Sequence, residues 1–436
     1  MVGERELPGV SPYVQVEDSR KALGLLSTAW WGRPSEGLSV VGVTGTNGKS
    51  SVTWMVQQIC QAAGQDSAVL GTLGVGAPPH LRPQPFTTPE APEFQEELEK
   101  LRARGFLVAA VEVSSHGLEL RRTYGTRFAV VVFTNLTQDH LDFHQTMDRY
   151  AAAKNLLFQE WERGADDVGT IAVVNADDPH LSAIVNGCTD TILTFGKGPE
   201  ADVYPREVRL DPSGIKMSCR LPDDTIEIET TLLGSFQVEN LLAATATALA
   251  LEIDAPAIAK GLSDLEPIPG RMERIDRGQE FLVVVDYAHT PDALQRAIES
   301  LRPFTSGQII LVFGCGGDRD RSKRFRMGHI ASLHADYIFL TDDNPRNEDP
   351  EKIRGEVLDG LLEGEATPRE IPERDRAIAS AIDRARPGDI VLITGKGHET
   401  VQIREDDVVP FDDRKVAAEK IAARLAQDAR RRGGRA

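Results

Sequence analysis

The chain has 436 residues, of which 41% are hydrophobic and 27% are charged, a composition typical of a folded globular protein. Its length predicts two or three domains rather than one core. Lysine and arginine total 49 and aspartate and glutamate total 67, so the formal net charge is −18. A negative field repels phosphate backbones, which disfavours nucleic acids and anionic membranes as partners. Any anionic ligand must therefore meet a local positive site.

The sequence lacks the marks of a membrane or secreted protein. No run reaches the roughly 18 to 20 apolar residues of a spanning helix. The start, MVGERE, lacks the basic-then-apolar order of a signal peptide. Four cysteines without CxxC spacing disfavour a disulfide framework and a zinc site: Cys60, Cys188, Cys219 and Cys315. We therefore expect a cytoplasmic protein that binds neither nucleic acid nor membrane.

The first half alternates apolar runs with helical patterns. We expect strands at residues 38–43, 67–71, 106–113 and 128–134, and helices at 50–63, 91–104 and 147–163. This alternation predicts an α/β domain with a doubly wound, mostly parallel sheet.

The second half begins with a different texture. Residues 170–231 contain short alternating segments, such as 225–231, and predict an antiparallel annex. A helix at 238–251 and a proline-glycine hinge at 267–270 follow. Strands at 281–286, 308–313, 337–341 and 389–394 then predict a second, Rossmann-like α/β domain. The basic tail at 430–435 is interpreted as a solvated, frayed end.

A phosphate-binding loop is predicted at residues 42–51, GVTGTNGKSS, between a strand and a helix. Its backbone N–H groups and the helix N-terminus favour an anion, and Lys49 can reach the outer phosphates. Ser50 is placed to bind Mg²⁺. The spacing is not the strict P-loop pattern, because residue 43 is valine. The predicted nucleotide contacts are Gly45, Thr46, Asn47, Gly48, Lys49, Ser50 and Ser51.

Polar residues follow the next two predicted strands. Glu112 ends one strand, and His140 lies in the segment TNLTQDHLD after the other. Strand ends of an open α/β sheet face the ligand crevice, so this carboxylate and imidazole can share a divalent ion. Capping or solvated roles remain open for both. Lys154 is a single lysine in an otherwise apolar helical turn, and a surface lysine is the alternative interpretation. The segment FTTPE at 86–90 can be interpreted from its residues alone as a helix cap.

The loop variant GTNGK, together with these segments in order, resembles the Mur ligase family, the ATP-dependent amide-forming enzymes of peptidoglycan precursor synthesis. The resemblance implies that Glu112 and His140 are Mg²⁺ ligands and that Lys154 is carbamylated by CO₂ and organises a second Mg²⁺. Lys49, Glu112, His140 and Lys154 are then the catalytic residues. It also implies nucleotide contacts from three later segments, through Asn240, Arg271 on phosphate and Asp286 near the ribose.

The resemblance further implies two substrate sites. The acyl substrate is held by Thr87, Thr88, Ser114 and Arg122. The segments GGDRD at 316–320, DNPR at 343–346 and TGKGHE at 394–399 are similar to the pocket of members that add a diamino acid to UDP-N-acetylmuramoyl-L-Ala-D-Glu. Its residues are Arg319, Asp343, Asn344, Pro345, Arg346, Gly395 and Glu399.

The DNPR form marks members that select meso-2,6-diaminopimelate, and a physical reason is available. A guanidinium at Arg346 binds the distal carboxylate, which lysine lacks. For DNPR alone, an Asx-type turn with a surface arginine is the alternative. L-Lysine, or a different carboxylate substrate, is the alternative function.

The implied reaction uses ATP and two Mg²⁺ ions. ATP phosphorylates the carboxylate, and the neutral amine of the diamino acid attacks the acyl phosphate to leave an amide, ADP and phosphate. No proton acceptor for the amine stands out. We expect a monomer. A catalytically inactive ATP-binding scaffold and a simple P-loop kinase are rival readings; the four catalytic residues argue against the first and the diamino-acid pocket against the second.

The segment before the phosphate loop departs from the family pattern. Residues 18–32 resemble only the closing helix of an N-terminal UDP-binding domain, and Leu120 replaces a frequent polar contact. We expect three parts: a remnant at 1–37, a central ATP-binding domain at 38–267 and a C-terminal amino-acid-binding domain at 268–436. A start site assigned too late, a natural short form and a paralogue acting on another acid are the competing explanations.

Overall fold

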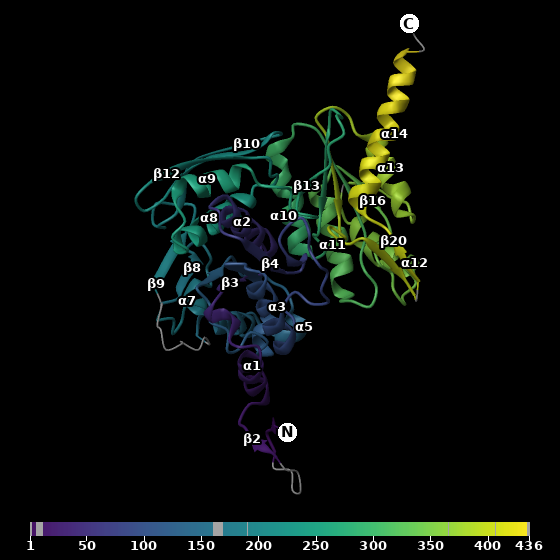
Figure 1. The fold of residues 1–436 in the computed structure, drawn as a ribbon. Helices are drawn as coiled ribbons and strands as arrows, with labels where there is room; N and C mark the ends of the chain where they lie inside the picture. Colours follow the sequence, from purple (N-terminus) through teal and green to yellow (C-terminus); the bar gives the residue numbers. More distant parts are fainter. Residues whose placement is uncertain are drawn as a thin grey trace. The chain divides into compact units, whose positions relative to one another are not determined.

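The computed structural model describes residues 2–5, 12–159, 169–189, 191–364, 366–405 and 407–433. The chain divides into two compact units (Figure 1). The first consists of Met1–Val208, Lys216–Thr230 and Val238–Glu266, and the second of Arg209–Ile215, Thr231–Gln237 and Pro267–Ala436. The last change of unit falls at the predicted hinge, 267–270.

Seven described strands form the sheet of the first unit, in the order β5-β4-β6-β3-β7-β8-β9. All neighbours pair in parallel except β4 and β5. The strands are β3 (Ser39–Thr44), β4 (Ser67–Gly71), β5 (Gly74–Gly76), β6 (Val108–Glu112), β7 (Val130–Phe133), β8 (Ile171–Asn175) and β9 (Thr191–Phe195). The chain runs outward from β3 to β4 and then returns to the other side through β6 and β7, so the sheet is doubly wound around β3, as expected.

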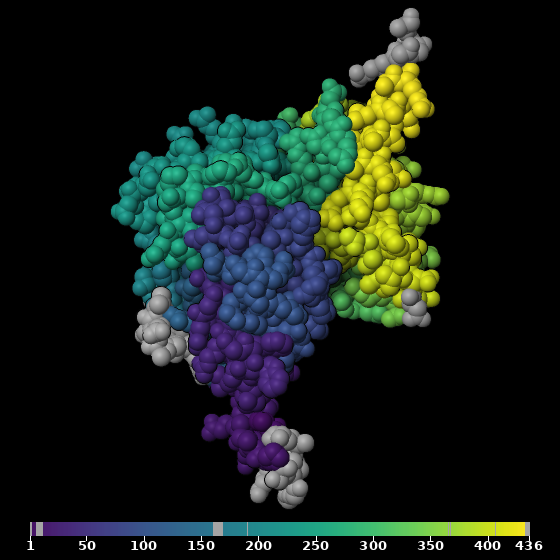
Figure 2. Space-filling model, in the orientation of Figure 1, coloured from purple at the N-terminus to yellow at the C-terminus, as the bar shows by residue number. Residues whose placement is uncertain are grey.

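Alternate residues of these strands face opposite layers of helices. Val40, Val111 and Val131 belong to one core cluster with Phe94 and Leu98 of α3 (Ala91–Ala103). Helix α2 (Lys49–Ala62) is buried along most of its length and contacts β4, β6 and α9 (Ala255–Ser263). Figure 1 shows α2 and α9 on the side of the sheet opposite α3. Figure 2 shows α1 (Ser19–Trp30), purple, against the blue segment that includes α3. Because both faces are covered, the central strands are apolar throughout.

Two predictions for the first unit are wrong. The expected helix 147–163 ends as α6 (Met147–Asn155), followed by one 3₁₀ turn, and residues 160–163 lie outside the described residues. Residues 171–195 do not join an antiparallel annex, because β8 and β9 extend the main sheet in parallel. Their short segments resemble annex strands locally, and pairing with β7 decides where they go. Only β10 (Tyr204–Asp211), β11 (Gly214–Arg220) and β12 (Thr225–Thr230) form a separate sheet.

Six described strands form the sheet of the second unit, in the order β13-β14-β18-β15-β16-β17. Their pairing is parallel except at β13. The strands are β13 (Glu273–Arg274), β14 (Leu282–Asp286), β15 (Ile309–Phe313), β16 (Tyr337–Leu340), β17 (Thr367–Glu370) and β18 (Ile390–Thr394). The last strand, β18, inserts between β14 and β15. The four predicted strands are confirmed, and β13 and β17 were not predicted from the sequence.

The helices of the second unit also lie on both faces of its sheet. One core cluster joins Val283, Val312 and Ile393 to α13 (Arg374–Arg384) and α14 (Asp413–Gly433). The other helices are α10 (Pro291–Leu301), α11 (Ser322–His334) and α12 (Pro350–Leu361), which contact one another in sequence order. The basic tail, predicted to be frayed, continues α14 as far as Gly433.

The remaining elements are small or lie at the edges of the units. They are β1 (Val2–Gly3), β2 (Val14–Gln15), α4 (Ser115–Glu119), α5 (Leu141–His144), α7 (Leu181–Ile184), α8 (Gln237–Ala250), β19 (Val401–Arg404) and β20 (Asp407–Pro410), with 3₁₀ helices at Pro34–Glu36, Leu156–Phe158 and Arg302–Phe304. None of the helices in the described residues combines the length and the apolar character needed to cross a membrane.

A buried ion pair between Arg374 and Asp413 holds the end of β18 in the second unit. Arg374 on α13 donates to both carboxylate oxygens of Asp413 at 2.7 Å, and both side chains are fully buried. The same guanidinium donates to the carbonyl of Thr394 at 2.8 Å, at the end of β18. Removing one partner leaves a buried charge without compensation. The pair therefore holds the strand end from which the segment 394–399 begins.

We expect Asp413→Asn to lower the free energy of unfolding by about 3 kcal/mol, because Arg374 keeps its charge and loses a charged acceptor. Urea denaturation measures this change. Asp428→Asn is the control, since Asp428 is an exposed partner of Arg424 on the same helix. An equal effect of the two substitutions would contradict the buried-pair argument.

Candidate functional site

The phosphate loop follows β3 and leads directly into α2, as predicted. Gly48 has a φ of 87° and precedes the helix as its N-cap. A β-carbon at this position would collide with Oδ1 of Asn240, which lies on α8. The loop backbone and Asn240 are thus in close contact, and only glycine combines this approach with the left-handed backbone.

The loop is fastened to the segment after β7 by backbone and side-chain hydrogen bonds. The N–H of Asn47 donates to Oδ1 of Asn135 at 3.0 Å, and Oγ1 of Thr134 donates to the carbonyl of Asn47 at 2.6 Å. Thr46 exchanges bonds with the backbone of Thr137, at 3.0 and 3.1 Å. These bonds fasten the loop at both its backbone and its side chains, so its N–H groups are held in a fixed arrangement suited to an anion.

Lys49, the first residue of α2, folds its side chain back over the loop. Its Nζ donates to the carbonyls of Gly45 and Thr46, both at 2.9 Å. The ammonium group therefore lies at the loop, where it offsets the negative net charge of the chain locally. Ser50 and Ser51, in the first turn of the same helix, are buried.

Lys154 is not the surface lysine that its sequence context also allowed. Its side chain is 1% exposed, and Nζ donates to the carbonyl of Gly45 at 2.8 Å. Nζ also lies 4.5 Å from the ring centre of Tyr150. Burial, with a further contribution from the Lys49 charge, lowers the pKa of Lys154 well below its usual value. The amine of Lys154 on α6 and that of Lys49 on α2 thus both donate to the Gly45 carbonyl of the phosphate loop.

Glu112 is the last residue of β6 and is paired with Val43 of the neighbouring strand β3. The side chain is 2% exposed. Its two oxygens accept hydrogen bonds from the N–H and the hydroxyl of Thr72, at 2.8 and 3.2 Å. Thr72 orients the carboxylate, and the carboxylate retains lone pairs for a cation.

His140 lies in the turn before α5, with a φ of 53°. The side chain remains 46% exposed. Partial burial, with a further contribution from the Lys49 charge, nevertheless lowers the pKa of His140 to about 4, and the Asp139 carboxylate opposes this shift. At neutral pH the imidazole is therefore uncharged, the form that ligates metals. Its ring centre lies 4.9 Å from that of His116 and 6.2 Å from that of Tyr150.

These residues fit a hard divalent cation held together with phosphates. Mg²⁺ usually takes one or two protein carboxylates and completes its shell with water and substrate phosphates. Among the described residues no group of three or more His, Cys, Asp or Glu side chains is placed to hold a metal. The predicted set contains only two such residues, Glu112 and His140, beside a serine and a lysine. Glu112 ends β6, His140 lies at the start of α5, and Ser50 and Lys154 lie on α2 and α6.

The predicted acyl-substrate residues lie together beside Glu112. Oγ1 of Thr88 donates to the Glu112 carbonyl at 2.9 Å and lies 3.1 Å from Oγ of Ser114. Oγ1 of Thr87 lies 2.9 Å from Oγ1 of Thr72, the residue that orients Glu112. The alternative reading of 86–90 as a helix cap agrees with the structure in position, because Glu90, the last residue of the segment, is the N-cap of α3, although its side chain makes no capping bond.

Arg122 joins this group from the other side. It donates to the carbonyl of Thr88 at 2.9 Å and pairs with Glu90 at 2.8 Å. Its Nε–H is buried and has no acceptor within the described residues. A buried donor of this kind is suited to an anionic or carbonyl group of a substrate.

Asp286 and Arg271 lie together in the second unit. Asp286 ends β14, and its carboxylate accepts from the N–H of Met272 at 2.9 Å and of Ala288 at 2.8 Å. Burial raises the pKa of Asp286. The carboxylate thus fixes the turn that carries Arg271, whose guanidinium lies 4.6 Å from the ring centre of Tyr287. The roles of both residues toward a nucleotide remain predictions.

The predicted amino-acid residues come from the ends of three strands, β15, β16 and β18, that pair side by side. Asn344 donates to Oε2 of Glu399 at 2.8 Å. Lys396 is fully buried and donates to Oδ1 of Asn344 at 3.0 Å and to Oε2 of Glu399 at 3.1 Å. A β-carbon at Gly395 would lie close to Oδ2 of Asp343. Asp343, Asn344, Gly395 and Glu399 therefore form one cluster.

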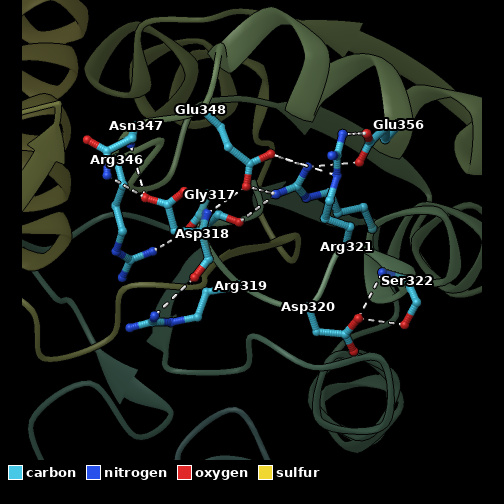
Figure 3. Close-up of polar contacts among 12 residues, drawn as sticks. Gly317, Asp318, Arg319, Asp320, Arg321, Ser322, Arg346, Asn347, Glu348 and Glu356 are labelled. Carbon is cyan, nitrogen blue, oxygen red and sulfur yellow. Dashed lines mark hydrogen bonds and ion pairs between the residues drawn. The ribbon is translucent and has the colours of Figure 1, made fainter. Parts of the chain in front are cut away.

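Arg346 extends from this cluster to the next loop (Figure 3). The residue has a φ of 50°, and its backbone bonds Ile403 and Glu405 at 3.1 and 2.7 Å. Its Nη1 donates to the carbonyl of Gly317 at 2.8 Å. The side chain is only partly buried. For the alternative reading of 343–346 as an Asx-type turn with a surface arginine, the structure shows that the arginine is partly buried and that its side chain is held by a hydrogen bond. Arg319 lies beside it, exposed, with Nη1 on the carbonyl of Asp318 at 3.1 Å.

Four residues of the site were missed in the sequence. Thr72 lies outside the predicted motifs, whereas Asn135 lies inside the segment TNLTQDHLD and Tyr150 lies one helical turn before Lys154, but none of the three was singled out, because each is an ordinary residue type for its position. Lys396 lies inside the predicted TGKGHE segment, but the sequence does not indicate that its side chain is buried. A lysine among glycines is normally solvent-exposed.

Comparison with known proteins gives a consistent result. The Mur ligase middle domain matches residues 43–248, and the Mur ligase glutamate ligase domain matches residues 270–397. The UDP-N-acetylmuramoyl-L-alanyl-D-glutamate–2,6-diaminopimelate ligase of Geobacillus thermodenitrificans is 43% identical over 425 residues, which cover 97% of this chain and 87% of that protein.

Two solved structures extend the comparison. A UDP-N-acetylmuramoyl-L-alanyl-D-glutamate–2,6-diaminopimelate ligase has a TM-score of 0.71 and 36% identity, over 97% of this chain and 86% of its own. The MurF ligase of Thermotoga maritima in complex with ADP has a TM-score of 0.63 at 18% identity, over 99% of this chain and 89% of its own, and shares the fold. The chain belongs to the Mur ligase family and is an ATP-dependent ligase that forms a carbon–nitrogen bond.

Proposed function

We propose that this chain joins meso-2,6-diaminopimelate to the D-glutamate γ-carboxylate of UDP-N-acetylmuramoyl-L-Ala-D-Glu, with ATP converted to ADP and phosphate. The observation that carries the proposal is the 43% identity to a relative named for this reaction, in an alignment that covers 87% of that relative. The position of Arg346 among the strand-end residues of the second unit supports the choice of diamino acid.

The first step activates the γ-carboxylate as an acyl phosphate. A carboxylate is a poor electrophile, and transfer of the γ-phosphoryl group supplies a leaving group. Lys49 is assigned to the transferred phosphoryl group, because its ammonium lies at the loop that cradles it. Residues 45–51 with Asn240, Arg271 and Asp286 are assigned to the nucleotide. Thr87, Thr88, Ser114 and Arg122 are assigned to the acyl substrate.

Mur ligases use Mg²⁺ with ATP, and we assign two ions to this chain. When bound, Mg²⁺ neutralises the charge that shifts during phosphoryl transfer. Ser50, Glu112 and His140 are the residues that would hold the first ion. Carbamylated Lys154 would hold the second, since a buried amine that is kept neutral can react with CO₂ to give a carboxylate.

In the second step, the amine of the diamino acid attacks the acyl carbon and phosphate leaves. Arg346 and Arg319 are assigned to the distal carboxylate, which lysine lacks. Asp343, Asn344, Pro345, Gly395 and Glu399 are assigned to the remainder of the amino acid, and the Glu399 carboxylate suits an ammonium group. The proposal places the ATP-binding part at 38–267 and the amino-acid-binding part at 268–436 of a monomer that works in the cytoplasm.

The experiment measures phosphate release from ATP by the purified protein with Mg²⁺ and UDP-N-acetylmuramoyl-L-Ala-D-Glu. We expect diaminopimelate to support turnover at least about 100-fold better than L-lysine, as kcat/KM, since a site built for a polar group rejects the analogue without it. Equal or better turnover with lysine would assign the alternative amino acid. Absence of turnover with either, while another carboxylate supports phosphate release, would assign a different acyl substrate.

A further inference from the structure

Two loops of the second unit are fastened to each other at the predicted amino-acid site. The loop after β15 carries Arg319, and the loop after β16 carries Arg346. The strands are parallel neighbours, with Phe313 paired to Leu340, so both loops leave the same edge of the sheet. In Figure 3 the two loops face each other through their polar groups.

The bonds between the loops are reciprocal. The N–H of Gly317 donates to the carbonyl of Asn344 at 2.9 Å, and Nη1 of Arg346 donates back to the carbonyl of Gly317 at 2.8 Å. Oδ2 of Asp318 accepts from the backbone and side-chain nitrogens of Asn347, at 3.2 and 2.8 Å. A β-carbon at Gly317 would collide with the carbonyl of Pro345. The loops thus pack too closely to shift independently.

Both loops contain a strained residue at this contact. Asp318 and Arg346 have φ values of 51° and 50°, in the left-handed region that side chains other than glycine disfavour. Such conformations persist where the surrounding contacts over-determine them. The backbone bonds of Arg346 to Ile403 and Glu405 hold its main chain, and the bond from its Nη1 to the Gly317 carbonyl ties its side chain to the other loop.

Glu348 lies behind this contact and bonds both sides. Its Oε1 accepts from the N–H of Asp318 at 2.6 Å. The same carboxylate receives two bonds from Arg324 on α11, at 2.8 and 3.0 Å. The Arg324 side chain is fully buried, so its position is set by packing. Glu348 is thus a fixed acceptor for the backbone of the first loop, on the chain segment that begins with Arg346.

Glu356 on α12 is a useful contrast. Its Oε2 accepts from Nη1 of Arg324 at 2.8 Å, and its Oε1 accepts from Arg321 at 2.6 Å. Arg324 therefore has two carboxylate partners, of which only Glu348 bonds the backbone at Asp318. Loss of either carboxylate leaves the other to balance the buried charge.

We propose that Glu348, held by Arg324, is a positioning residue that fixes the Asp318 loop and thereby orients Arg346 for the distal carboxylate of the amino-acid substrate. The role in substrate selection rests on the proposed function. The fixed loop contact does not, because it is a property of the protein without substrate.

The test compares Glu348→Gln with the matched Glu356→Gln in the full-length enzyme. Glu348→Gln places an amide against Arg324 and weakens the bond to Asp318. We expect KM for diaminopimelate to rise about 10- to 30-fold, with kcat and KM for ATP within about threefold of the parent enzyme. Glu356→Gln is expected to leave KM for diaminopimelate within about twofold. Equal effects of the two variants, or parallel loss in kcat and both KM values, would overturn the proposal.

Hydrogen exchange at the Asp318 amide separates this proposal from the proposed function. We expect exchange to accelerate in Glu348→Gln and to stay unchanged in Glu356→Gln, whichever amino acid is the substrate. If diaminopimelate is not a substrate but exchange changes as expected, the proposed function fails and the loop contact stands. Unchanged exchange in Glu348→Gln overturns the loop contact itself.

Asp318→Asn is the second variant, for use if Glu348→Gln does not fold. It weakens the acceptor for Asn347 and leaves the pair between Arg324 and Glu348 intact, and asparagine tolerates the left-handed backbone. A rise in KM for diaminopimelate without a matching fall in kcat supports the positioning role. An unchanged KM contradicts it.

Discussion

Replacing Lys154 by alanine is expected to lower kcat by about 10²- to 10³-fold, the size of effect seen when one group that stabilises transition-state charge is removed. The amine is buried beneath the phosphate loop, 2.8 Å from the Gly45 carbonyl, so solvent cannot replace it. If the residue acts as a carbamate, added formate or acetate should restore part of the activity. Steady-state phosphate release, with and without the added acid, measures both effects.

Lys154→Met is the matched control. Methionine keeps most of the side-chain volume, so the cavity that admits acetate in the alanine variant is filled. We expect both variants to lose activity and only the alanine variant to be rescued. Rescue of neither variant would favour a role of Lys154 as an unmodified amine, and rescue of both would show that acetate acts elsewhere. Mass spectrometry of the native enzyme kept with bicarbonate would report one added CO₂ directly.

Replacing Arg346 by alanine is expected to raise KM for diaminopimelate by about 10²- to 10³-fold, since the substrate carboxylate would lose its guanidinium partner in a partly desolvated site. Alanine has the same left-handed backbone cost as arginine, so the fold loses mainly the bond to the Gly317 carbonyl. L-Lysine has no distal carboxylate, and its kcat/KM should change little. The preference for diaminopimelate over lysine should therefore collapse.

Arg404→Ala is the control for this prediction. The backbones of Arg404 and Arg346 pair in an isolated β-bridge, and the Arg404 side chain donates to Gln402. This side chain is 48% exposed and is assigned no substrate contact. We expect KM for diaminopimelate to stay within about threefold in this variant. A similar rise in both variants would indicate a general effect of positive charge. An unchanged KM in Arg346→Ala would mean that another cation binds the carboxylate.

Much of the architecture was predictable because it depends on local pattern. Apolar runs of strand length between helical repeats located β3, β4, β6, β7, β14, β15, β16 and β18. The glycines and lysine of 42–51 located the phosphate loop, since that backbone shape requires particular residue types. The family resemblance supplied the order of the later motifs, which no single motif establishes.

The local sequence pattern gave wrong predictions where tertiary contacts determine how a segment pairs or where a helix ends. The segments at 171–175 and 191–195 read as annex strands, yet they pair in parallel beside β7. The helix that begins at Met147 ends at Asn155, where residues 156–158 turn to pack Leu157 and Phe158 in the core. No feature of the residues alone distinguishes these outcomes, because each depends on which partner surface is available.

The residue types at 45–51, 112, 140, 154 and 343–346 predicted the chemistry, because phosphate, metal and carboxylate each demand particular donors. The folded chain decided the environment of those residues. It buried Lys154 under the loop, turned Thr72 onto Glu112, and used Arg324 and Glu348 to hold the loops around Arg346. Burial and orientation arise from contacts between residues that are distant in the chain. The composition gave a net charge of −18, and packing showed where the positive charge that anionic ligands require is concentrated, at Lys49 on the phosphate loop.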